Sequence, residues 1–348
     1  MLKRSSVAAA AWRPSPLVVV IEAVWLVAVI AFPFLPLGLG IFFGIDLLVL
    51  SILALSLDLC WGVAGIICLG QAAFFGAGAY TVAVLNTSVG TSSGLLVLAA
   101  AIAVAAAFAF VLGLFLFSGR RDVGLWYLAL ATLAVTYAAE RFVTSTHTLG
   151  ADSGIPAIIV DFPFVSSWGS TSSYYVLAAV LLIVYGGLRV LLRSETGLVL
   201  RAMREDPERI SFFGHSLFRL RLGVFTASAA LAGLAGGLSA ITTGFVSADL
   251  LGLGLSTSAL LWLIIGGGGV LVGALIGTAV LEILRLELST AYPTGWPVAI
   301  GFMIVAFVTI LPGGLMGLVA RAHARMHRPD PIETVPPAAP GAGSEEFT

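Results

Sequence analysis

Long apolar runs recur along the whole chain and are separated by short polar segments. Each run is continuous rather than alternating, and most reach the roughly 20 residues that a helix needs to cross a bilayer. Alanine and leucine fill these runs, so helices satisfy the buried backbone better than a β-barrel would. The pattern predicts an all-α, polytopic transmembrane bundle of about ten crossings, some of them short or broken by glycine. They are expected at 17–37, 41–61, 66–85, 95–117, 123–143, 173–192, 222–243, 256–265, 270–286 and 297–311.

The composition agrees with burial in lipid. Hydrophobic residues make up 59% of the 348 residues and charged residues only 10%, whereas an ordinary soluble domain carries about 25% charged residues. This excludes a soluble globular protein. The two cysteines, Cys60 and Cys68, lie inside apolar runs, where we interpret them as packing residues rather than a disulfide or a metal pair.

Basic residues fall on one side of the predicted bundle. Fifteen of the 17 lysines and arginines lie in segments that the alternation of crossings places on a single face, and such an excess marks the cytoplasmic face of a bacterial inner membrane. The two exceptions, Arg141 and Arg285, each have an acidic residue nearby. We therefore expect a multi-pass inner-membrane protein with both termini in the cytoplasm. The fifteen are Lys3, Arg4, Arg13, Arg120, Arg121, Arg189, Arg193, Arg201, Arg204, Arg209, Arg219, Arg221, Arg321, Arg325 and Arg328.

The crossings define the organisation of the chain. Five precede the longest external loop and five follow it, entering from opposite sides, which permits an inverted 5+5 repeat. The tail lacks apolar periodicity and is expected to be disordered. The predicted parts are a cytoplasmic N-terminal segment (1–16), a transmembrane domain (17–320) with an external loop (144–172) and a cytoplasmic loop (193–221), and a cytoplasmic tail (321–348).

The segment 62–80 departs from a plain membrane helix. It holds five glycines and a glutamine, Gln71, at the middle of the span. Glycines allow backbones to approach closely or break a helix beside a cavity, and a polar amide there can contact a solute. The alternative is a tight helix–helix interface in which a neighbouring group satisfies Gln71.

The segment 266–273 is too rich in glycine for an uninterrupted helix. It predicts a hinge or a re-entrant turn, with a short loop as the alternative. The candidate hinge residues are Gly266, Gly267, Gly268 and Gly269.

The cytoplasmic loop contains signals for a short bounded helix. Asp206 can cap a helix whose first residue is Pro207, and Gly214 can end it. Apolar side chains amid the charge suit docking to a partner, whereas a basic connector that reaches lipid headgroups is the alternative. These apolar residues are Ile210, Phe212 and Phe213.

Taken in order, six segments resemble the permease subunits of ATP-binding cassette (ABC) importers of the branched-chain amino acid type, the LivM-like permeases. Urea and short-amide permeases are close relatives. The resemblance covers about residues 41–320, with departures at Cys68, where serine is usual, at Gly150 and Ala151, and at the bulky Phe212 and Phe213. LDLCWG and AYPTGWP look similar to the urea branch, so the solute stays open. The six segments are CLGQAAFFGAGAY (68–80), GLWYLALATLA (124–134), TLGADSGI (148–155), RAMREDPER (201–209), FTASAALAGLAGGL (225–238) and GGGGVLVGALIG (266–277).

This resemblance implies a half-channel that works with a second, LivH-like permease, two cytoplasmic ATP-binding subunits and a periplasmic or lipid-anchored solute-binding protein. Membrane lipid is the remaining partner, and no nucleic acid is expected. The residues expected to line or support the translocation path are Gln71, Phe74, Phe75, Tyr80 and Thr132. Those expected to couple to the ATPase are Glu205, Asp206, Pro207, Glu208, Arg209, Ile210, Phe212, Phe213 and Gly214.

No catalytic constellation is visible, so we expect a transport subunit rather than an enzyme, without cofactor or metal. Lys3 is the single lysine, and no G-x-x-x-x-G-K-[ST] loop is present to hold ATP phosphates. The four histidines lie outside the predicted spans and have no metal-ligand partners in the sequence.

Two other classes compete with this hypothesis. An ion-coupled secondary transporter would explain broken helices without partner chains, and the acids Asp46 and Asp58 keep that reading open. It lacks a complementary lysine or histidine inside any predicted span. A membrane scaffold predicts no transport, and leaves the glycine-broken spans without a purpose.

Overall fold

The described part of the chain is built almost entirely of helices, with one short strand pair. The computed structural model describes residues 16–34, 40–90, 93–118, 125–156, 158, 160, 171–292, 295, 298, 300–303, 307, 309 and 313–318. The α-helices there are α1 (Pro16–Ala31), α2 (Gly40–Leu57), α3 (Gln71–Val89), α4 (Gly94–Phe117), α5 (Leu125–Ser145), α6 (Thr171–Arg193), α7 (Glu195–Glu205), α8 (Pro207–Phe212), α9 (Leu217–Thr243), α10 (Leu253–Gly266) and α11 (Leu271–Ala291). Strands β1 (Ile155–Pro156) and β2 (Phe245–Val246) pair antiparallel.

Short helical turns join some of these elements. The most informative is η2 (Asp58–Val63), a π-helical turn that continues α2. Such widened turns are rare and are found frequently at functional sites. The other turns are 3₁₀-helical: η1 (Phe32–Phe34), η3 (His147–Leu149), η4 (Ala151–Ser153) and η5 (Ala248–Leu251).

Five of these helical segments are long and apolar enough to cross a membrane: Gly40–Val63, Gln71–Val89, Gly94–Phe117, Thr171–Arg193 and Leu217–Thr243. A sixth candidate is the pair α10 and α11, whose axes are bent by 115° at a short break. The all-α polytopic fold is therefore confirmed. The number of ten crossings stays a prediction, as does the inverted repeat.

Several predicted segments fall outside the described residues. They include nearly all of the N-terminal segment 1–16, the tail 321–348, positions 161–170 of the external loop and much of the last run, 297–311.

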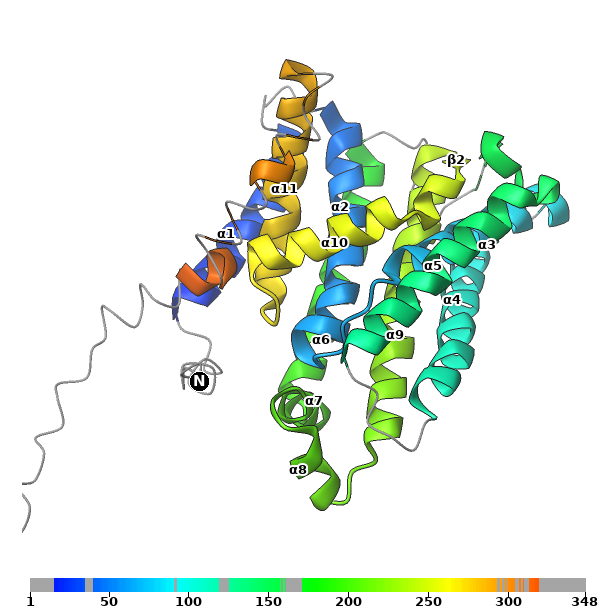
Figure 1. Cartoon of the computed structure of the whole chain (residues 1–348). Coiled ribbons are helices and arrows are strands. Elements are labelled where there is room, and N and C mark those ends of the chain that lie inside the picture. Colours follow the sequence, from blue (N-terminus) through cyan, green and yellow to red (C-terminus); the bar gives the residue numbers. More distant parts are fainter. Residues whose placement is uncertain are drawn as a thin grey trace, which may run out of the picture.

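Helix α9 forms the centre of the bundle and packs against α2, α3 and α4, as Figure 1 shows. Small residues make the close crossing of α3 and α9 possible. At Gly236 a Cβ atom would overlap the backbone oxygen of Phe75, and at Gly78 it would overlap the backbone of Gly233. Close backbone approach through glycine is a common way of packing helices in membranes, where apolar lipid supplies no hydrophobic drive.

Helix α1 is joined to α6 by polar contacts. Arg189 forms an ion pair with Glu22, and the Tyr185 hydroxyl donates to the same carboxylate at 2.9 Å. Burying an ionisable side chain within a transmembrane bundle costs free energy unless it is paired in this way.

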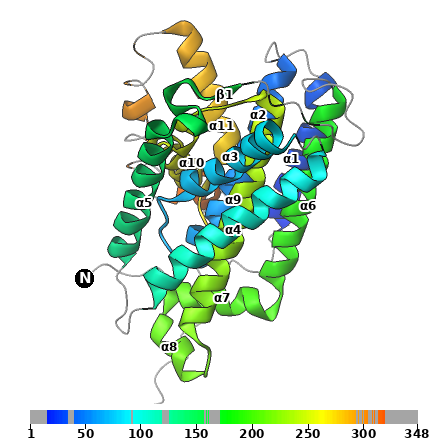
Figure 2. The ribbon, with the colours of Figure 1, turned by 90° about the vertical axis from the view of Figure 1, so that its right-hand side faces the viewer.

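The bundle has two distinct ends. Helices α7 and α8 lie together at one end, and the strands lie at the other, as both ribbon views show (Figures 1 and 2). The predicted cytoplasmic loop 193–221 and the described part of the external loop 144–172 thus occupy opposite ends.

The side of the membrane that each end faces can be tested with single cysteines at Ser153 and His215, both of which are exposed. An impermeant maleimide should label Ser153→Cys in spheroplasts, whereas His215→Cys should react only after the membrane is permeabilised. The native Cys60 and Cys68 are buried, so the parent protein provides the background control. Equal labelling of both variants in intact spheroplasts would contradict the predicted topology.

Candidate functional site

Gln71, the first residue of α3, is clamped between two other helices. Its side chain is 1% exposed. The amide Nε2 donates to Ser228 Oγ on α9 at 2.7 Å, and Ser228 in turn donates to the carbonyl oxygen of Ser56 on α2 at 2.7 Å. The amide Oε1 has no hydrogen-bond partner among the described atoms. Ser228 thus satisfies the NH₂ group of Gln71, as expected if Gln71 belongs to a tight helix–helix interface. The amide oxygen accepts no hydrogen bond from the described atoms.

Side chains from other helices satisfy the irregular backbone that leads into α3. The Leu69 N–H donates to Thr132 Oγ1 on α5 at 3.1 Å, and the Ala72 N–H donates to Ser256 Oγ on α10 at 3.1 Å. The first N–H groups of a helix have no partner within it, so such contacts are needed in an apolar interior. Thr132, one of the predicted path residues, thereby fixes the start of α3.

The aromatic path candidates on α3 are also buried. Phe74 packs edge-to-face on Phe108 and Phe225, with ring centroids 5.6 and 5.4 Å apart. Phe75 is 1% exposed, and Tyr80 is 6% exposed with a hydroxyl that lacks a partner in the described structure. The structure therefore places these residues inside the protein, and their assignment to a translocation path stays a prediction.

The glycine-rich segment breaks the chain between α10 and α11. Gly266 ends α10, and Gly267 and Gly269 adopt φ values of +100° and +94°, which residues with a Cβ rarely adopt. The predicted break at 266–269 is confirmed, whereas its role as a hinge stays a prediction.

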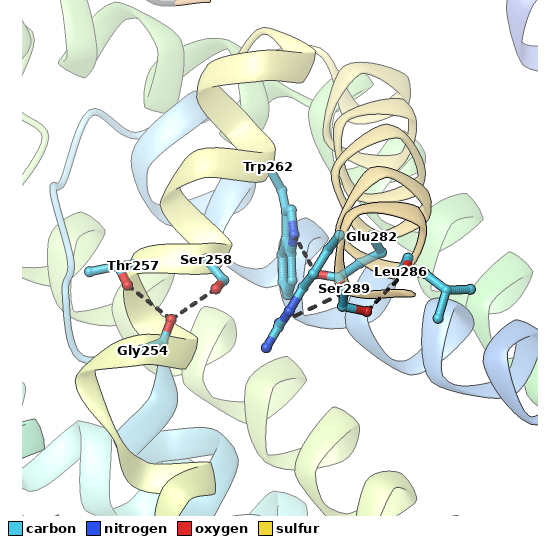
Figure 3. Close-up of polar contacts among 8 residues, drawn as sticks. Gly254, Thr257, Ser258, Trp262, Glu282, Leu286 and Ser289 are labelled. Atoms are coloured by element: carbon cyan, nitrogen blue, oxygen red, sulfur yellow. Dashed lines mark hydrogen bonds and ion pairs between the residues drawn. The ribbon is translucent and has the colours of Figure 1, made fainter. Parts of the chain in front are cut away.

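A buried contact holds the two arms of this bent pair together. Trp262 Nε1 on α10 donates to Glu282 Oε1 on α11 at 3.1 Å (Figure 3). Arg285, one turn further along α11, lies 3.9 Å from the other oxygen of Glu282. The Glu282 carboxylate is thus compensated on both sides.

The turn itself lies against the end of α2. The Gly269 N–H donates to Asp58 Oδ1 at 2.6 Å, and Arg204 on α7 donates to the Gly62 carbonyl oxygen. At Gly62 a Cβ atom would overlap both Asp58 and Gly269. Sequence reasoning missed this junction: Asp58 was considered only as a coupling acid, and Arg204 only as a basic residue of the cytoplasmic loop. The sequence signal that could have indicated this junction is the carboxylate of Asp58 near the end of an apolar run, followed closely by Gly62.

The short bounded helix predicted within the loop 193–221 is confirmed as α8, whereas its cytoplasmic location stays a prediction. Asp206 caps it by accepting a hydrogen bond from the Arg209 N–H at 3.2 Å, and its other oxygen pairs with the Arg209 guanidinium at 2.8 Å. Pro207 is the first residue, and Gly214, just beyond the end, has φ +82°. Glu205 and Glu208 are exposed beside this cap.

The apolar residues of α8 and of its C-cap, Phe213, have two different roles. Ile210 is buried in the protein's own core, so it holds the helix in place. Phe212 and Phe213 are 87% and 79% exposed at the tip. Two exposed aromatic rings on a fixed, charged helix form a surface that can receive a partner, and we call Phe212 and Phe213 the aromatic tip.

Comparisons with known proteins identify related chains. A family described as the permease component of branched-chain amino acid transport systems matches residues 41–320. Over 323 residues the chain is 30% identical to the high-affinity branched-chain amino acid transport system permease protein LivM of Salmonella typhimurium, covering 84% of this chain and 73% of the relative. The LivM protein of Escherichia coli is 29% identical over the same shares.

A further relative is a probable branched-chain amino acid transport permease protein, LivH, from Methanocaldococcus jannaschii. It is 30% identical over 219 residues, which cover 57% of this chain and 66% of the relative. No solved structure gives a significant match.

Gln71 can be tested for a role beyond packing by comparing Gln71→Leu with Ser228→Ala. Both variants break the same hydrogen bond, but only the first removes the amide. We expect Gln71→Leu to lower solute uptake about fivefold at equal amounts of membrane-inserted protein, which corresponds to ~1 kcal/mol for one lost polar contact with the solute. Ser228→Ala should leave uptake per inserted protein near the parental rate. If the two variants lose uptake equally, and only as far as their insertion falls, Gln71 is a packing residue.

Proposed function

The chain belongs to the family of branched-chain amino acid transport permeases, and from this premise we propose that it is the permease subunit of an ABC importer for branched-chain or other small amino acids. Its close relatives carry names of amino acid permeases, which favours amino acids over urea or amides. The inner membrane, with both termini in the cytoplasm, is the location that the basic residues support.

The aromatic tip is the observation that carries the proposal. An ABC importer is driven by ATP, and this sequence contains no motif for holding ATP phosphates. In such an importer a separate ATP-binding chain would have to contact this one. The tip offers two exposed rings on a helix fixed by the Asp206 cap and by Ile210. Buried aromatic anchors surrounded by charge are typical of the strongest contributors to protein interfaces. We assign this surface to a cytoplasmic ATP-binding subunit, with Glu205, Glu208 and Arg209 at its rim.

The exposed face of α5 supports a second, LivH-like permease as a partner. Large side chains recur along this face at helical spacing, among them Trp126, Leu130 and Tyr137. Arg141 lies on the same face, with its guanidinium 5.2 Å from the centroid of the Tyr137 ring. A second permease that covers this exposed face of α5 would bury its large apolar side chains and enclose a path between the two chains. A periplasmic or lipid-anchored binding protein would deliver the solute to that path.

The aromatic tip is tested by the double variant Phe212→Ala with Phe213→Ala. Each ring should contribute ~2 kcal/mol to the interface, so affinity for the ATP-binding subunit should fall about 30-fold for each ring removed. Co-purification from detergent and ATP-dependent uptake in proteoliposomes measure the loss. The matched control is Phe110→Ala with Phe115→Ala, which removes two exposed rings from α4. Parental co-purification and uptake in the tip variant would show that the rings only rest on the membrane surface.

A further inference from the structure

A carboxylate is buried where α2 loses its regular helical geometry. Asp58 is fully buried and opens the π-helical turn η2. Its Oδ1 accepts the Gly269 N–H, whereas Oδ2 has no hydrogen-bond partner within the described chain. Burying a charged carboxylate costs several kcal/mol unless opposite charge and hydrogen bonds compensate it. A single backbone N–H offsets only a small part of this cost, so positive charges near Asp58 are important for stabilising its carboxylate.

Those cations come from α7. The positive charges of Arg204 and Arg201 both act on the Asp58 carboxylate. Partial burial lowers the pKa of Arg201, and the Asp58 charge opposes that shift. Arg204 also donates to the Gly62 carbonyl oxygen in η2, and its aliphatic stem covers Gly65. A helix outside the predicted spans therefore supplies the electrostatic support for a group buried in the bundle.

Three elements meet at this junction without spare room. The Gly62 Cα would not tolerate a Cβ atom, because Asp58 and the Gly269 nitrogen occupy that position. A Cβ atom on Gly269 would in turn lie 2.9 Å from Arg204 Nη1 and from the Gly62 carbonyl oxygen. Closely packed groups of this kind transmit displacement rather than absorb it.

The junction is also continuous with the aromatic tip. Helix α7 ends at Glu205, and α8 begins at Pro207, so only Asp206 separates them. Met203 and Leu200 of α7 are buried in the core, which ties α7 to the bundle while α8 projects beyond it. A force applied to α8 thus reaches Arg204 through a few residues of ordered chain.

We propose that Asp58 and Arg204 are positioning residues that join the α7–α8 pair to the α10–α11 turn, so that motion of a docked ATP-binding subunit is transmitted to the glycine break. This inference rests on the proposed function, and it names the residues that would carry the coupling from the docking surface into the bundle. Asp58 holds the turn by accepting the Gly269 N–H. Arg204 holds η2 by donating to the Gly62 carbonyl oxygen, and its positive charge acts on the Asp58 carboxylate.

The first test measures solute molecules imported per ATP hydrolysed in proteoliposomes that contain the complete transporter. Arg204→Met removes the charge and the donor while keeping the stem, whereas Arg204→Lys keeps a positive donor. The matched control is Arg219→Met, at an exposed position on α9. We expect Arg204→Met to lower the import ratio about fivefold or more, with the Lys and Arg219 variants within about twofold of the parent. Asp58→Asn, which keeps the shape and an acceptor for Gly269, should lower the ratio as Arg204→Met does.

A double-mutant cycle separates transmission from general destabilisation. If the two residues act through each other, the double variant Asp58→Asn with Arg204→Met should be no worse than the more affected single variant, because coupled residues are not additive. Spin labels on cysteines at Ser153 and Val270 add a direct readout. Their separation should change when the ATP-binding subunits are trapped with vanadate in the parent and in Arg204→Lys, and should stay fixed in Arg204→Met.

The outcomes distinguish this inference from the function on which it rests. A parent transporter without ATP-dependent uptake would overturn the proposed function and the inference together. A coupled parent in which Arg204→Met and Asp58→Asn import normally and show the parental change in label separation would overturn the inference alone. Detergent gel filtration and retention of the ATP-binding subunit confirm that each variant is folded.

Discussion

Every irregular stretch of backbone within an apolar bundle needs a hydrogen-bond partner from the same chain, and this constraint organises the structure. Lipid offers no such partner. Thr132 supplies one for Leu69 before α3, Ser256 supplies one for Ala72, and Asp58 supplies one for Gly269 in the α10–α11 turn. Each donor lies at or just outside the end of a helix, and each acceptor belongs to a different helical element. The places where helices break are therefore also the places where distant parts of the chain are fastened together.

The most consequential of these fastenings uses a charge. Asp58 provides the acceptor for the turn, and the positive charges that act on its buried carboxylate belong to α7 at the end of the bundle. The contacts that stabilise the broken helix therefore also connect α7 to the core of the bundle. Beyond α7, the Asp206 cap and the buried Ile210 hold α8 so that its two phenylalanines face away from the protein. The residues that support the junction and those that form the exposed aromatic tip therefore lie close together in the sequence.

Local patterns were sufficient for the long helices, the start of α8 and the glycine break, but not for the contacts between them. Apolar runs predicted the long helices, Asp206 and Pro207 predicted the start of α8, and consecutive glycines predicted the break before α11. The burial of Gln71 depends on Ser228, 157 positions away, and the Asp58–Gly269 contact spans 211 positions. Contacts between residues so far apart in the sequence produce no periodic pattern of apolar and polar residues from which they could be predicted. The π-helical turn and the β1–β2 pairing were missed for the same reason, because each is decided by what the fold brings beside it.

Dependence on ATP-binding partners is the central claim, and an ion-coupled carrier is its main competitor. The direct measurement is uptake of labelled leucine into proteoliposomes that contain either this chain alone or the chain with its second permease, ATP-binding subunits and solute-binding protein. Uptake should require the complete set and enclosed ATP, and it should persist when ionophores abolish proton and sodium gradients. Uptake by the chain alone, driven by an imposed ion gradient without ATP, would contradict the account.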